Sequence, residues 1–222
     1  DYSVGSFYYS FVIGCNKDAA GECPKTWAEL FDTATFPGKR TFYKWSAPGV
    51  IEAALLADGV APADLYPLDL DRAFKKLDTI KGDIIWWSSG AQSQQMLASA
   101  ETPFGSFWNG RLTALADSGV TVETSWDQNI TAADSLVVPK GAKNKAEAMK
   151  FIALATSAKP QAEMAVATGY APINLDAPAE MDPAIRATLP DQQAATQINA
   201  DMTYWAAHRD EIGSRWYAWQ AQ

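Results

Sequence analysis

Apolar and polar positions alternate along the chain in short blocks that predict strands and helices in turn. Segments rich in aromatic and β-branched residues read as strands, and these are residues 6–14, 40–45, 83–87, 103–108, 120–125 and 132–138. Helices are expected over residues 50–57, 69–80 and 144–155, and from residues 26, 91 and 111. Because strands that alternate with helices imply parallel pairing, the pattern predicts an α/β sheet.

Three predicted helices carry start signals. Thr26 precedes Glu29 by three residues, and Asn144 precedes Glu147 by the same spacing, so each pair can form a capping box. Asp69 can cap the helix that follows it, in which apolar residues recur on one face. The closing segment places further residues on one helical stripe, namely Met202, Trp205, Ala206, Arg209, Trp216 and Trp219. We expect its tryptophans to pack on a sheet rather than to meet a ligand.

Composition narrows the class of protein. The 222 residues are 48% apolar and 20% charged, which is typical of a globular chain. No apolar run approaches the roughly 18 residues that a membrane-spanning helix needs. The net charge of −8 repels a phosphate backbone, so nucleic acid is not an expected partner. A cationic or zwitterionic partner remains compatible with this charge.

The chain contains two cysteines, Cys15 and Cys23, and one histidine, His208. The cysteine spacing allows a disulfide in an oxidising compartment, or two unpaired thiols that lie close together. Two cysteines and one histidine do not make a zinc site, so neither a metal nor another cofactor is expected. The chain opens at Asp1 without a basic start or an apolar leader, which leads us to expect a processed or cut N-terminus.

Aromatic residues stand near the ends of three predicted strands. Open α/β sheets bind ligands beyond the carboxyl ends of their strands, a rule that selects Trp45, Trp87 and Trp108. Small or polar residues follow each of them, including Ser46 and Ser88, and would let a ligand approach the amides at the start of a helix. Ordinary loop chemistry explains the same residues equally well.

Signals for catalysis are weak. Neither a G-x-S-x-G elbow nor a glycine-rich phosphate loop occurs, and no local pattern selects a pair of acids for glycoside hydrolysis. The sequence therefore favours a binding protein over an enzyme.

Several motifs occur in the order found in one family. They are T-W-A-E-L-F at residues 26–31, F-G-S-F-W-N-G-R at 104–111, D-S-L-V-V-P at 134–139, K-N-K-A-E-A at 143–148 and G-Y-A-P-I-N at 169–174. The chain resembles bacterial periplasmic solute-binding proteins of ABC transporters, specifically the spermidine/putrescine-binding group. Residues 6–16 are similar to the first strand that crosses between the two lobes of these proteins.

The resemblance implies a type II periplasmic-binding-protein-like α/β fold with one nearly complete lobe and a remnant of the other. We expect residues 9–131 with 179–222 to form the second lobe, and residues 1–8 with 132–178 to form the crossing strand and the remnant of the first. Family members begin with roughly a further hundred residues. A chain without them exposes an apolar face, which predicts self-association.

The resemblance also assigns ligand-binding roles. The stacking tryptophan of the family falls on Trp108, the amine-binding aspartate on Asp134 and the pocket tyrosine on Tyr170. The remaining ligand-binding candidates are Tyr8, Tyr9, Trp45, Ser46, Ser88 and Arg111.

The chain departs from the polyamine-binding pattern at three places. Residues 46–49 lack the acids of that group, Ala132 replaces an aromatic, and Arg111 stands where part of the family keeps an acid. A guanidinium group suits a carboxylate. A ligand with both an amine and a carboxylate therefore competes with a polyamine.

The sequence thus predicts the periplasmic substrate-binding component of an ABC importer. It would capture a small cationic or zwitterionic, polyamine-like metabolite and present it to an inner-membrane ABC permease. The alternative is a Trp-rich carbohydrate-binding or carbohydrate-active protein.

Overall fold

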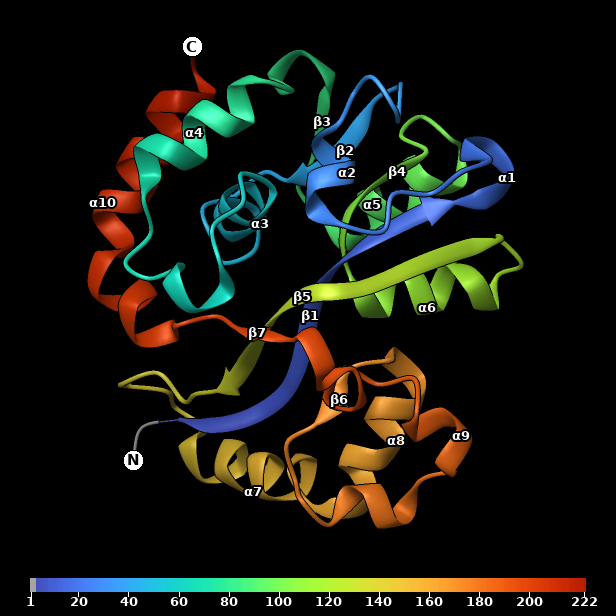
Figure 1. Cartoon of the computed structure of the whole chain (residues 1–222). Helices are drawn as coiled ribbons and strands as arrows, with labels where there is room; N and C mark the ends of the chain where they lie inside the picture. Colours follow the sequence, from blue (N-terminus) through green and yellow to red (C-terminus); the bar gives the residue numbers. More distant parts are fainter. Residues whose placement is uncertain (1–2) are drawn as a thin grey trace.

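The computed structural model describes residues 3–222, which form one mixed sheet with helices around it (Figure 1). The strands follow the order β3-β2-β4-β1-β5-β7, and β6 pairs with β1. Their bounds are β1 Val4–Asn16, β2 Arg40–Tyr43, β3 Ile84–Trp87, β4 Phe104–Trp108, β5 Val122–Leu136, β6 Ala171–Pro172 and β7 Ile198–Asn199.

The predicted α/β class is confirmed, but the expectation of parallel pairing holds for only part of the sheet. Strand β2 runs parallel to β3 and β4, as βαβ connections require. Strand β1 is antiparallel to both β4 and β5. It precedes the βα units and inserts between β4 and β5, so no crossover helix sets its direction.

Strand β5 corrects one prediction. Residues 120–125 and 132–138 were expected to form separate strands, whereas Val122–Leu136 is continuous. Polar residues between the two apolar blocks look like a break in the sequence pattern. They form a bulge opposite the Phe11–Ile13 stretch of β1, where Gln128 adopts a φ of 50°. Asn129 in this bulge is buried and accepts a hydrogen bond from the Ser10 hydroxyl.

The helices expected from residues 26, 50, 69, 91, 111 and 144 all begin within two residues of these positions, and α1, α8 and α9 are additional. Their bounds are α1 Lys17–Ala20, α2 Trp27–Phe31, α3 Val50–Ala57, α4 Leu70–Asp78, α5 Gly90–Ala98, α6 Asn109–Asp117, α7 Lys145–Ala155, α8 Ala158–Thr168, α9 Pro183–Arg186 and α10 Met202–Gln220. The capping box of Thr26 and Glu29 is present, and Asp69 caps α4. The capping box expected at Asn144 is wrong, because this residue has a ψ of 42° rather than the extended backbone that side-chain capping requires.

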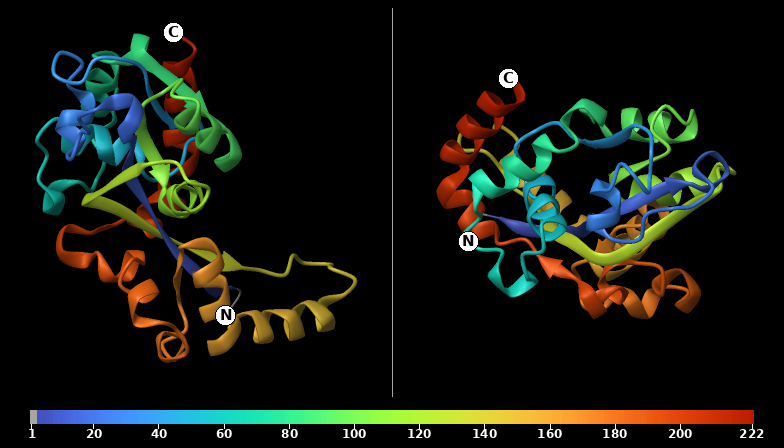
Figure 2. Two further views of the ribbon diagram at one scale, coloured as in Figure 1. Left: turned by 90° about the vertical axis from the view of Figure 1, so that its right-hand side faces the viewer. Right: turned by 45° about the horizontal axis from the view of Figure 1, so that its top comes forward.

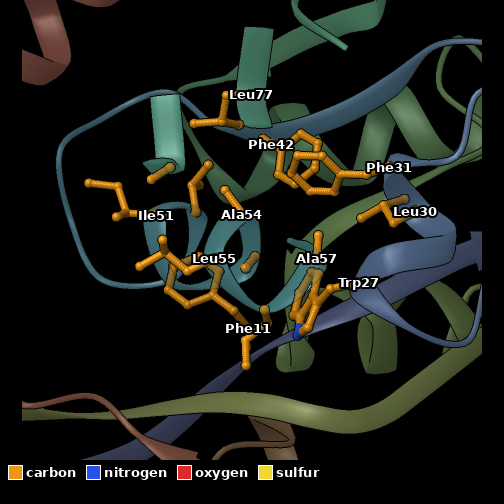
Figure 3. Packing of buried hydrophobic residues seen from close by; sticks show 14 of the residues in the cluster. Phe11, Trp27, Leu30, Phe31, Phe42, Ile51, Ala54, Leu55, Ala57 and Leu77 are labelled. Carbon is orange, nitrogen blue, oxygen red and sulfur yellow. The ribbon is translucent and has the colours of Figure 1, made fainter. Parts of the chain in front are cut away.

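Helix α3 is the centre of the main core. Every residue of Val50–Ala57 is buried, and all of them except Glu52 are apolar, as expected for a helix enclosed by the core. Figure 3 shows Ile51, Ala54 and Leu55 of this helix among side chains from β1, β2, α2 and α4. The packing anchors the helices to the sheet on which the candidate site is built.

The tryptophans of α10 pack on both the sheet and a helix. Trp216 and Trp219 contact Trp86 of β3, as predicted, and also Phe74 of α4. The predicted stripe is wrong at three positions, since Met202, Ala206 and Arg209 are exposed. The buried line of α10 runs through Trp205, Ile212, Trp216 and Trp219.

Helices α7, α8 and α9 gather on the side of β1 and β5 away from α4 and α10 (Figures 1 and 2). A small separate core forms there from Ala162, Ala165, Ala171, Ala177, Met181 and Leu189. Helix α7 leaves Phe151 and Leu154 each 63% exposed. This apolar surface is compatible with self-association, which stays a prediction, as does the expected division into two lobes.

A disulfide joins Cys15 at the end of β1 to Cys23 after α1. Of the two states that the sequence left open, the structure therefore contains the bonded one. Among the described residues, no helix combines the length and apolar character needed to cross a bilayer.

Glu52 provides a test of the core. Its carboxylate is fully buried in α3 and accepts hydrogen bonds from the Gly49 amide, the Tyr66 hydroxyl and the Trp205 indole, at 2.8, 2.7 and 2.7 Å. Burial raises its pKa above the ordinary 4.5, and these bonds offset part of the rise. Because the folded state holds the proton more tightly than the unfolded state, ionisation of Glu52 lowers stability as pH increases.

We therefore expect the stability difference between wild type and Glu52→Gln to shrink as pH rises from about 4 to about 8. Denaturant unfolding across this range measures it, with the exposed Glu101→Gln as the matched control. A difference that stays constant with pH, or grows, would contradict the assignment.

Candidate ligand-binding site

Alternation along β1 creates one wall of the candidate site. Successive side chains of a strand point to opposite faces, so Phe7, Tyr9 and Phe11 share a face while Tyr8 points away. Directly paired residues on antiparallel strands lie on the same face. Trp108 of β4 pairs with Phe11, and Asp134 of β5 pairs with Phe7. Register alone therefore brings these side chains to one surface.

Two further elements complete the arrangement. Helix α6 starts directly after Trp108 and places Arg111 within its first turn. Tyr170 follows Gly169, which ends α8 in the left-handed conformation at a φ of 71°. The Tyr170 ring stacks on Phe7 with 5.1 Å between ring centroids and 9° between planes.

These side chains line a cavity of about 340 Å³. The lining consists of Phe7, Tyr9, Phe11, Tyr43, Ala47, Trp108, Arg111, Asp134 and Tyr170. Small-molecule sites in proteins commonly combine such apolar and aromatic walls with a few polar groups. The size suits a compact metabolite.

The Trp108 ring is held by its aromatic neighbours. Tyr43 and Trp87 contact it at centroid distances of 5.1 and 4.8 Å, and Tyr9 meets it at 6.2 Å with 78° between planes. Edge-to-face contacts of this kind stabilise aromatic clusters beyond the area they bury. The indole is therefore fixed before any ligand arrives.

Asp134 and Arg111 bring opposite charges to the cavity. Neither residue forms an ion pair with any of the described residues. Burial raises the pKa of the Asp134 carboxyl, and no cation opposes that rise. The Nε atom of Arg111 and the indole Nε1 of Trp108 are buried and lack a hydrogen-bond partner among the described residues. The cavity thus offers unused donors, a cation and an anion.

The two tyrosine hydroxyls respond to the same charges. Burial raises the pKa of Tyr9 well above 10.0, and the nearby Asp134 carboxylate adds to the effect. Burial also raises the pKa of Tyr170, and the Arg111 guanidinium beside it offsets part of that rise. Both hydroxyls stay protonated at neutral pH and can donate or accept hydrogen bonds.

Asn109 ties the walls of the cavity together. This buried side chain accepts a hydrogen bond from the Ser10 amide of β1 at 3.0 Å and donates one to the Gly169 carbonyl at 2.6 Å. It thereby connects β1, α6 and the turn before Tyr170. The W-N-G motif contributes a structural bridge as well as the aromatic ring of Trp108.

The structure brings together five of the residues expected to bind ligand, namely Tyr9, Trp108, Arg111, Asp134 and Tyr170. The other four lie elsewhere. Tyr8 points to the opposite face of β1, beside Asn199 and Met202. Ser88 is exposed, and its hydroxyl and amide donate to Gln92.

Trp45 and Ser46 also lie outside the cavity. Trp45 is 43% exposed and contacts the Tyr217 ring of α10, and the Ser46 amide donates to the Tyr217 hydroxyl at 3.4 Å. The expected strand 40–45 ends two residues early, so Tyr43 takes the position at the cavity that we assigned to Trp45. Trp87 is buried behind Trp108.

Sequence reasoning missed four residues of the lining, Phe7, Phe11, Tyr43 and Ala47. A signal for two of them was present, because Phe7 and Phe11 share the period-2 alternation of Tyr9 along β1. Nothing local marks Tyr43 or Ala47, which reach the site through the pairing of β2 and the turn after it.

Fold and site together define a binding protein with an aromatic cavity that contains two unpaired charges. The family model for bacterial extracellular solute-binding proteins matches residues 2–196, and the chain belongs to this family. The predicted resemblance and the non-enzymatic class are confirmed by this membership. The predicted periplasmic location agrees with the family and with its periplasmic relatives.

Individual relatives refine the comparison. The gamma-aminobutyric acid (GABA)-binding protein of Pseudomonas aeruginosa is 33% identical over 99% of this chain and 64% of its own length. The spermidine/putrescine-binding periplasmic protein of Salmonella typhimurium is 28% identical over 89% of the chain and 58% of its own. A solved GABA receptor structure is 78% identical with a TM-score of 0.94, covering all of this chain and 69% of that one.

The chain therefore spans less than two thirds of the curated relatives it matches. The predicted type II fold is confirmed by the structural match. The alternative of a carbohydrate-binding or carbohydrate-active protein finds no support among these relatives.

Replacing Asn109 by Ala tests the bridge. The change leaves the Ser10 amide and the Gly169 carbonyl buried without partners, and each such group costs about 1–3 kcal/mol. Denaturant unfolding should show a loss of at least about 2 kcal/mol. Asn144→Ala, at an exposed position without a capping bond, is the control. A loss no larger than that of the control would show that the bridge is dispensable.

Proposed function

We propose that the cavity binds a small zwitterion with an ammonium group at one end and a carboxylate at the other, of which GABA is the simplest example. Asp134 accepts the ammonium group and Arg111 binds the carboxylate. Tyr9, Trp108 and Tyr170 enclose the methylene chain between them. These ligand roles are proposals that the placement of the residues supports.

The observation that carries the proposal is the pair of opposite, unpaired charges in one cavity. Asp134 is exposed and Arg111 half-buried, so a ligand can reach both charges. A ligand that covers them must neutralise both, because a charge buried without a partner is costly. A planar guanidinium group binds a carboxylate through two parallel hydrogen bonds. Aromatic faces favour the ammonium end through cation–π attraction.

The same charges argue against a diamine. The second ammonium group of putrescine would approach the Arg111 guanidinium, and like charges in a cavity repel. Relatives of both kinds occur, since one is named for GABA and another for spermidine and putrescine. The electrostatics of this cavity favour the first. The carboxylate-bearing ligand is thus preferred over the polyamine-like one.

The proposed physiological role is that of the substrate-binding component of an ABC importer. The protein would take up its ligand in the periplasm and present it to an inner-membrane permease. We propose that residues 9–131 with 179–222 form one lobe and residues 1–8 with 132–178 the crossing strand and part of the other. Ligand binding between lobes would then couple occupancy to closure.

Calorimetric titration tests the charge assignment. The 222-residue chain and the full-length gene product are both titrated with GABA and with putrescine. Asp134→Asn and Arg111→Gln should each weaken GABA binding by about 30-fold or more, the usual cost of removing one partner of a buried charge pair. The exposed Asp117→Asn and Arg186→Gln serve as matched controls. Variants that bind GABA as tightly as wild type would refute the assignment.

A pH titration provides an independent prediction. Only the ionised Asp134 pairs with an ammonium group, and burial has raised its pKa. GABA affinity should therefore begin to fall, as pH decreases, above the ordinary aspartate value of 3.8. The Asp134→Asn variant should lack this step. The same pH profile in both proteins would exclude Asp134 as the titrating group.

A further inference from the structure

Three glycines that follow the parallel strands share an unexpected feature. Gly49, Gly90 and Gly110 come after β2, β3 and β4. Small residues at such strand ends suggest room for a ligand to reach backbone amides. In this structure the space beside each glycine is filled by a side chain that lines the cavity.

The distances show how tight these contacts are. A Cβ atom on Gly49 would lie 2.7 Å from the Phe11 ring, one on Gly90 would lie 2.6 Å from Arg111 Cζ, and one on Gly110 would lie 2.7 Å from the Tyr170 ring. Real Cβ atoms essentially never approach other heavy atoms within 3.0 Å. Each glycine therefore provides the close approach that only a residue without a side chain permits.

Of these three glycines, Gly90 is the one at which an added methyl group would meet a side chain without straining the backbone. Gly49 has a φ of 120°, which demands glycine for conformational reasons, and Gly110 also contacts the backbone carbonyl of Thr168. Gly90 is buried at the first position of α5, without a left-handed φ. The three atoms nearest its missing Cβ are all from the Arg111 side chain, namely Nε, Cζ and Cδ.

Packing against Gly90 places the guanidinium here, beside the Tyr170 hydroxyl. The start of a helix carries a partial positive charge and does not attract a cation. No acid of the described residues forms an ion pair with Arg111. The position of the guanidinium therefore depends on the space that Gly90 leaves.

We infer that Gly90 is a specificity-determining position, because its missing side chain seats the Arg111 guanidinium where it selects a ligand carboxylate and repels a second ammonium group. This inference rests on the proposed function of the cavity. Gly90 itself is a positioning residue, which acts through Arg111.

Alanine at position 90 should change selectivity without unfolding the protein. Alanine is a better helix former than glycine, and the nearest obstacle is the flexible side chain of Arg111, which can swing away. Once the guanidinium has moved, a ligand carboxylate no longer has a partner, and the second ammonium group of a diamine is no longer repelled. General damage to the site would instead lower the affinities for both ligands by similar factors.

The experiment compares wild type, Gly90→Ala, Arg111→Gln and the double variant by titration with GABA and putrescine, in the full-length gene product. The GABA-to-putrescine affinity ratio should fall by about tenfold or more in Gly90→Ala. The double variant should match Arg111→Gln, because the guanidinium that Gly90 positions is absent from both. Gly82→Ala, with no atom within 4 Å of its missing Cβ, should keep the wild-type ratio.

The outcomes separate this inference from the proposed function. If Arg111→Gln lowers the ratio and Gly90→Ala does not, Gly90 has no such role while the ligand assignment stands. If Arg111→Gln leaves the ratio unchanged, both fail. A crystal structure of Gly90→Ala gives a readout that needs no ligand: we expect the guanidinium to have left its wild-type position, and an unmoved guanidinium overturns the inference.

Discussion

The pairing of β1 with both β4 and β5 is the constraint on which the site depends. It places Phe11 opposite Trp108 and Phe7 opposite Asp134, so an aromatic wall and a carboxylate meet on one face. A register slip of one residue would turn all of these side chains to the other face. Buried hydrogen bonds among the side chains of Ser10, Asn129 and Thr131 stabilise the register where β1 pairs with β5.

The cavity contains charges and N–H donors without partners, which a purely structural core would avoid. Asp134 and Arg111 remain unpaired by the described residues, and two N–H donors on Trp108 and Arg111 have no acceptor there. The fold tolerates these unpaired groups because other elements supply most of its stabilising contacts. The fully buried α3, the tryptophans of α10 and the disulfide all lie outside the cavity lining.

The sequence predicted residues of the site correctly where they belong to a family motif. Trp108, Arg111, Asp134 and Tyr170 all stand in or beside short motifs, and all line the cavity. The general rule about strand ends was less reliable, since Trp45, Ser46 and Ser88 lie outside it. That rule indicates an edge of the sheet, whereas a one- or two-residue change in where a strand ends decides which side chain faces inward.

Local patterns were sufficient to predict most of the longer strands and helices, the α/β class and the family, because periodicity, capping residues and motifs are properties of neighbouring residues. Long-range contacts decided the rest: the antiparallel insertion of β1, the continuity of β5 through its polar bulge, and the arrival of Tyr43 at the cavity. The role of Gly90 belongs to the same group. A missing side chain has no signature in sequence until the fold brings Arg111 against it.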